Sequence, residues 1–175
     1  MSSGEARSWV DVEAVLLARE KEAMAASAPG MVWCAELALR SRSVVGWEGE
    51  APPWGGERSE PEGLDAFLGA RRLKLRVYYP ESFPMVPAEI VPLDPRPPME
   101  VRGFQQCHVN PDGSLCNVQS AYDWRPGRDT AAELVLKASG WFIEYLLLSE
   151  GRIERMTERG IGVDTSLDDL IAGTR

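Results

Sequence analysis

The spacing of apolar residues predicts one helix near the start of the chain, followed by strands. Between Val10 and Ala26, apolar side chains recur at helical intervals. The apolar face is expected to hold Val12, Val15, Leu16, Ala18 and Met24, and the wet face Glu13, Arg19, Glu20 and Lys21. Pro29-Gly30 ends this helix. Met31 to Leu39 then alternate well enough to predict a strand.

Three more strands are expected in the middle of the chain. A short one includes Val44, Val45 and Trp47, and the Pro-, Gly- and Glu-rich segment from Glu48 to Gly63 then predicts an exposed loop. Leu73 to Tyr79 show the clearest alternation. Pro80 to Pro87 form a proline-punctuated turn, and Ala88 to Leu93 predict the last strand.

The C-terminal half is expected to be irregular at first and helical afterwards. Asp94 to Asp123 have little periodicity, whereas Asp129 to Ser149 have a long apolar face typical of a helix, and Arg152 to Arg159 predict a shorter one. We expect a domain over residues 1–160 and a loosely attached tail over 161–175. Because helices and meandering strands are segregated along the chain, the predicted fold class is α+β with an antiparallel sheet.

Charge and composition exclude several functions. The formal net charge of −8 is unfavourable for binding nucleic acid or an anionic membrane, since both need clustered Lys and Arg. The N-terminus lacks the features of a signal peptide, and the most apolar stretch, Leu134 to Leu148, is interrupted by charged residues. We therefore expect a cytoplasmic protein in which Cys34, Cys107 and Cys116 are free thiols.

The segment from Gln106 to Cys116 holds the only histidine and two of the three cysteines. A zinc site is one interpretation, but Cys107 and His108 are adjacent and only Asp112 remains nearby as a fourth ligand. A cysteine hydrolase is a second, with His108 as the base for Cys116.

Acyl transfer from a thioester to an amine is the third interpretation. This chemistry needs a thiol and a donor for the tetrahedral oxyanion, and an Asn side chain can supply about 3–4 kcal/mol of barrier lowering. Asn110 precedes Cys116, and Asp112-Gly113 turn the chain between them.

Several motifs in this region resemble those of the ubiquitin-conjugating enzymes, in the order that the family has them. They are Tyr79 to Pro87, His108-Val109-Asn110, Gly113 to Cys116, Trp124 with Pro126, and the helix from Asp129. Val109 replaces the family's Pro, and the spacing from Asn110 to Cys116 is shorter. Compact members of this kind are similar to proteins of bacterial operons for ubiquitin-like conjugation, linked to antiphage defence.

The resemblance implies an N-terminal helix, a four-stranded antiparallel meander and C-terminal helices. It implies that Cys116 carries the thioester and that Asn110 stabilises the oxyanion or holds the active-site loop. Structural roles near the site are implied for His108, Asp112, Gly113, Trp124 and Pro126.

The implied partners are proteins. A ubiquitin-activating-like enzyme would pass a ubiquitin-like protein to Cys116, and a target protein would receive it on lysine. No cofactor or metal is expected, because adenylation belongs to the activating enzyme. A non-catalytic binding module on the same fold is the alternative function.

Overall fold

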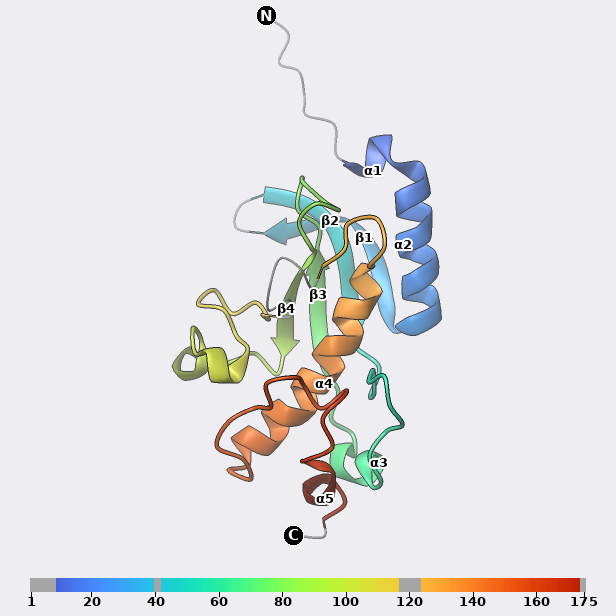
Figure 1. Ribbon diagram of the computed structural model, residues 1–175. Coiled ribbons are helices and arrows are strands. Elements are labelled where there is room, and N and C mark those ends of the chain that lie inside the picture. Colours follow the sequence, from blue (N-terminus) through green and yellow to red (C-terminus); the bar gives the residue numbers. More distant parts are fainter. Residues whose placement is uncertain (1–8, 40–41, 117–123, 174–175) are drawn as a thin grey trace, which may run out of the picture.

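The computed structural model describes residues 9–39, 42–116 and 124–173. Its centre is a four-stranded antiparallel sheet in the order β1-β2-β3-β4, formed by Met31–Leu39, Arg42–Glu50, Lys74–Tyr78 and Glu89–Asp94. The predicted α+β class and all four strands are confirmed. Helix α2, Ala14–Ser27, flanks the sheet, and the long helix α4, Ala131–Ser149, crosses it (Figure 1).

Two short helices replace the single helix predicted at the N-terminus. Helix α1 spans Trp9–Val12 and α2 spans Ala14–Ser27, with Glu13 between them at non-helical backbone angles. The predicted faces are partly wrong, because Val15 is 85% exposed whereas Glu20 is fully buried. Helix α2 therefore turns a different face to the interior than the one predicted, and the hydrogen bonds of Glu20 explain why.

Glu20 joins three parts of the fold in the interior. Its Oε2 accepts hydrogen bonds from the Tyr79 hydroxyl at 2.8 Å and from the backbone N–H of Ala131 at 2.9 Å. Tyr79 in turn accepts a bond from the Trp47 indole at 3.1 Å. Burial raises the pKa of the Glu20 carboxyl, although the bonds from Ala131 and Tyr79 oppose this. A carboxylate at a helix N-terminus is favourable because N–H groups there lack helical partners.

Helix α4, Ala131–Ser149, begins two residues later than predicted and ends where predicted. Thr130 and Glu133 form a capping box that fixes its start. The helix packs on the face of the sheet that presents Leu75, Val77 and Ile90, all of which are buried. The opposite face is polar, and there Glu48 of β2 pairs with Arg76 of β3.

The C-terminal segment is attached firmly, so the prediction of a loose end is wrong. Arg58 binds Asp168 through both carboxylate oxygens, at 2.6 and 3.0 Å. Leu167 and Ile171 are buried in the core. Helix α5, Asp168–Ile171, lies beside α3, Leu64–Leu68, at one end of the molecule (Figure 1).

Two other local predictions need correction. Residues 152–159 form bends and irregular backbone instead of a helix. The segment predicted as an exposed loop continues β2 to Glu50 and is then partly buried, with Ala51 and Pro61 inside the protein. The segment predicted to be irregular from Asp94 onward contains two short 3₁₀ helices, Met99–Val101 and Gln105–Cys107. In the described ranges, no helix is long and apolar enough to cross a membrane.

Candidate functional site

The segment that carries His108 and Cys116 is a tight hairpin. The N–H of Asn110 donates to the carbonyl of Ser114 at 2.8 Å, and the N–H of Cys116 donates to the carbonyl of His108 at 2.9 Å. Val109 and Leu115 form the antiparallel pair between these bonds, and both side chains are buried. The hairpin is fixed to the sheet where Leu115 N–H donates to the carbonyl of Ile90 at 2.8 Å. A Val at position 109 therefore serves as a core anchor.

The tip of the hairpin is held by its own polar side chains. Gly113 has a φ of +91°, which L side chains rarely adopt, and its N–H donates to the Asn110 carbonyl at 2.9 Å. The Asp112 carboxylate accepts from the backbone N–H and the hydroxyl of Ser114, at 3.0 and 2.7 Å. Asp112 and Gly113 thus have the turn-forming roles expected of them.

The Asn110 side chain also points into this turn. Its Nδ2 donates to the Ser114 hydroxyl at 2.9 Å. Asn110 is not one of the described residues that line the cavity beside Cys116. The geometry therefore favours the loop-organising role of Asn110 over direct stabilisation of an oxyanion.

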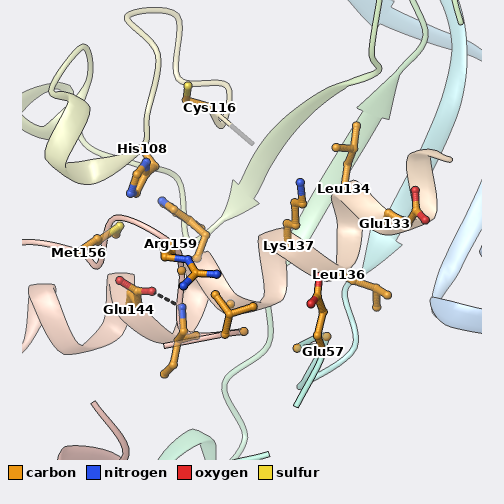
Figure 2. A pocket seen from close by; sticks show the side chains of 18 of the residues that line it. Glu57, His108, Cys116, Glu133, Leu134, Leu136, Lys137, Glu144, Met156 and Arg159 are labelled. Atoms are coloured by element: carbon orange, nitrogen blue, oxygen red, sulfur yellow. Dashed lines mark hydrogen bonds between the residues drawn. The ribbon is translucent and has the colours of Figure 1, made fainter. Parts of the chain in front are cut away.

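Cys116 lies at the edge of an open cavity of about 580 Å³. Figure 2 shows Cys116 and His108 on one side of this cavity, with Glu133, Leu136 and Lys137 of α4 on the other. Arg159 lies between the two sides. The cavity lining combines a partly exposed thiol with apolar side chains, among them Trp141, and with charged side chains of both signs.

Glycines let three chain segments close around the far wall of the cavity. A methyl group at Gly55 would lie 2.5 Å from the carbonyl oxygen of Leu136, and one at Gly162 would lie 3.2 Å from the Cα of Gly56. These close approaches bring the 55–57 segment, helix α4 and the 156–163 segment together. A side chain at Gly55 would push the wall apart, because the backbone of Leu136 lies too close for any Cβ.

Glu144 holds the 157–161 segment from within α4. Its carboxylate accepts from the Thr157 N–H at 2.6 Å, from the Thr157 hydroxyl at 2.8 Å and from the Ile161 N–H at 2.7 Å. The residue is 2% exposed, and burial raises the pKa of its carboxyl, although those bonds oppose the shift. A buried carboxylate persists in a folded protein when hydrogen bonds satisfy its oxygens.

Sequence reasoning missed this residue. The available signal was a single acidic side chain amid the apolar residues of the α4 helix, where an unpaired carboxylate is unfavourable. That signal indicates a polar partner for Glu144, but it does not identify the 157–161 segment as that partner.

His108 reaches the same segment from the hairpin. Its Nε2 lies 3.0 Å from the carbonyl oxygen of Thr157. The backbone of His108 is left-handed, with a φ of +51°, at the junction of a 3₁₀ turn and the hairpin. The expectation that His108 ties down backbone near the site agrees with this contact.

The residues beyond Cys116 differ in their burial. Trp124 is buried, its indole N–H donates to the Pro84 carbonyl at 2.7 Å, and its ring lies 6.1 Å from that of Phe83. Pro126 is exposed, so packing at this place falls to Trp124. Residues 117–123, Asp123 among them, lie outside the described residues.

Asp129 fixes the backbone just before α4. Its carboxylate accepts from the backbone N–H of Arg125 at 2.8 Å and pairs with the Arg125 guanidinium at 2.8 Å. Burial acts to raise the pKa of Asp129, but the hydrogen bonds and charge of Arg125 outweigh it and hold this pKa below its ordinary value. The loop into α4 is therefore organised by an ion pair at the cavity rim.

The other chemically capable residues lie elsewhere. The Cys107 thiol is buried, which raises its pKa, and Cys34 lies within β1. Ser149 donates to the Leu146 carbonyl and Glu150 pairs with Arg71, away from the cavity lining that is described. Across the described ranges, no three His, Cys, Asp or Glu side chains gather as ligands for a metal ion.

Comparison of this chain with models of protein families, with curated proteins and with solved structures found no match.

Proposed function

We propose that this protein is a conjugating enzyme of the ubiquitin type. Cys116 accepts the C-terminal acyl group of a ubiquitin-like protein as a thioester and releases it to an amine. The observation that carries the proposal is the position of Cys116, a partly exposed thiol at the edge of a cavity of about 580 Å³ on a rigid hairpin. The short motifs shared with the ubiquitin-conjugating enzymes, and the α+β fold, support it.

The chemistry requires little from the protein besides positioning. Attack of the Cys116 thiolate on a donor thioester forms a new thioester on Cys116 and breaks the donor C–S bond, so that the donor leaves as a thiolate. An amine then attacks the carbonyl carbon, the C–S bond breaks, and an amide is released. Holding the acyl group beside its acceptor can supply much of the acceleration, because it removes the entropy cost of the encounter.

A charging assay tests the proposal. The protein is incubated with ubiquitin, ubiquitin-activating enzyme and ATP, and separated without reductant. We expect a band shifted by one ubiquitin that a thiol reductant removes and that Cys116→Ala lacks. The matched control is Cys34→Ala, which changes a partly exposed thiol in β1 and should charge normally. Cys107→Ala changes a buried thiol and serves as a second control.

The surface near α1 and α2 fits a protein partner. A hollow there is lined by the apolar side chains of Trp9, Leu16 and Phe83, and its lining also includes Arg19, Glu13 and Glu81. Val15 on its rim is 85% exposed. We propose that the activating enzyme docks here and offers apolar side chains to this hollow.

A pair of variants tests this docking surface. Val15→Glu should slow charging, since it places a carboxylate at the contact. Val32→Glu, at a residue 65% exposed on β1, should leave charging unchanged. Equal charging of the two variants would contradict the assignment of the surface.

The alternative is a non-catalytic binding module on the same fold. It predicts that the protein binds a ubiquitin-like partner without ever forming a thiol-sensitive adduct. Binding that persists in Cys116→Ala, together with the absence of any adduct on the wild type, would favour this alternative.

A further inference from the structure

His108 and Cys116 lie opposite each other on the two arms of the hairpin. The N–H of Cys116 donates to the carbonyl of His108, next to the antiparallel pair Val109 and Leu115. Both side chains line the same cavity, where Figure 2 shows the imidazole below the thiol.

The contact with Thr157 fixes which nitrogen of His108 carries the proton. The Thr157 oxygen is a backbone carbonyl, which can only accept, so Nε2 of His108 must donate to it at 3.0 Å. In the neutral ring the other nitrogen, Nδ1, then carries a lone pair and no proton. The imidazole thus keeps an acceptor for a proton within the cavity.

Glu144 makes this orientation rigid. Its carboxylate binds both the N–H and the hydroxyl of Thr157, and so holds the residue whose carbonyl holds the imidazole. The chain of contacts runs from a buried helix residue through Thr157 to His108. A base oriented by a further group is the arrangement found in nucleophilic sites.

We propose that His108 is the proton acceptor for the chemistry at Cys116. When Cys116 is loaded, the thiol proton passes to Nδ1, and the thiolate attacks the carbonyl carbon of the donor thioester. The donor C–S bond breaks, the donor leaves as a thiolate, and the imidazolium gives it the proton, so the ring is neutral again. During discharge, which rests on the proposed function, the attacking amine gives its proton to Nδ1. The C–S bond breaks, Cys116 leaves as thiolate, and the imidazolium returns the proton to it.

Other charged groups face this cavity. The carboxylates are Glu57, Asp129 in the loop before α4, Glu133 and Glu144 in α4, and Glu158 in the 156–163 segment. The cations are Arg125, Lys137 and Arg159. None of these groups is an imidazole, and the chain has one histidine, so a change at His108 removes the only imidazole in the protein.

The first test reads the tautomer directly. Because the chain contains one histidine, a long-range ¹H–¹⁵N NMR spectrum shows a single imidazole. At a pH where the ring is neutral we expect the proton on Nε2 and an unprotonated Nδ1. A proton on Nδ1 would overturn the proposal, and this result needs no variant.

The second test uses His108→Gln, whose amide can still donate to the Thr157 carbonyl but cannot accept a proton near neutral pH. Two rates are followed against pH: alkylation of Cys116 by iodoacetamide, read on its own peptide apart from Cys34, and discharge of ubiquitin from Cys116 to free lysine. General-base catalysis predicts that discharge slows by about 10²- to 10⁴-fold and that the pH dependence of both rates differs from that of the wild type.

The two hypotheses can fail separately. If Cys116 is charged but His108→Gln discharges within about threefold of the wild type with the same pH profile, the inference about His108 is wrong. If Cys116 is never charged, yet its alkylation depends on His108, the conjugating function is wrong and the pairing stands. Because the alkylation test needs no activating enzyme, it decides the pairing in either case.

Discussion

Replacing Glu144 with Leu should detach the wall of the cavity that the 157–161 segment forms. The carboxylate accepts from two backbone N–H groups, those of Thr157 and Ile161, and from the Thr157 hydroxyl. Leucine has a similar volume but no acceptor. Each buried donor left without a partner costs about 1–3 kcal/mol. Relief of burying a charge offsets part of this, so we expect a net loss of about 2–4 kcal/mol in the free energy of unfolding.

Chemical denaturation measures that loss, and amide hydrogen exchange locates it. The Thr157 and Ile161 amides should exchange faster in Glu144→Leu, while those of β3 keep their protection. The matched control is Glu22→Leu, an exposed position on α2, which should change stability by less than about 0.5 kcal/mol. A Glu144→Leu variant as stable as this control, with unchanged exchange at Ile161, would refute the role assigned to Glu144.

Three further predictions concern stability. Burial raises the pKa of Glu20 in the folded protein above its ordinary value of 4.5, so Glu20 stabilises the fold below pH 4.5 and loses this stabilisation as the pH rises through the folded-state pKa. The free energy of unfolding of Glu20→Gln, measured by denaturation relative to wild type, should therefore rise with pH above about 4.5. Gly55→Ala should lose about 1–3 kcal/mol in the same assay, since the new methyl group meets the Leu136 backbone and one chain must move. Asp168→Ala should cost about 1 kcal/mol, because the Arg58 ion pair is partly exposed, and should speed proteolysis of the C-terminal segment; unchanged cleavage would mean that Leu167 and Ile171 alone hold that segment.

Alternation of apolar residues was a sufficient signal for the sheet. The strand predicted from Met31 to Leu39 is observed with the same bounds, and the α4 helix differs by two residues at its start. These elements bury a regular face, so their periodicity is visible in the sequence. The antiparallel meander follows because each strand pairs with the next one along the chain.

Tertiary hydrogen bonds override the pattern elsewhere. Glu20 lies on a face predicted to be wet, and becomes buried because it binds Tyr79 and the start of α4. The helix predicted from Arg152 to Arg159 does not form, since Glu144 and His108 bind the backbone of Thr157 directly. Such long-range partners leave no periodic signal in the sequence.

The candidate site was predictable in its residues but not in its geometry. The sequence places His108, Asn110 and Cys116 close together, and the hairpin keeps them so. It does not reveal that Asn110 turns toward Ser114, or that α4 and the C-terminal segment complete a cavity beside the thiol. Both features depend on contacts between segments that are distant along the chain.

The measurement that tests the central claim most directly is the intact mass of the protein after incubation with ubiquitin, ubiquitin-activating enzyme and ATP. The account predicts one added ubiquitin that thiol reductant removes from the wild type. Cys116→Ser should carry the same mass as an ester, which reductant leaves in place, and Cys116→Ala should carry none. If the wild type gains no thiol-sensitive mass while the activating enzyme charges normally, Cys116 is not an acyl carrier in this reaction, and the catalytic account is contradicted.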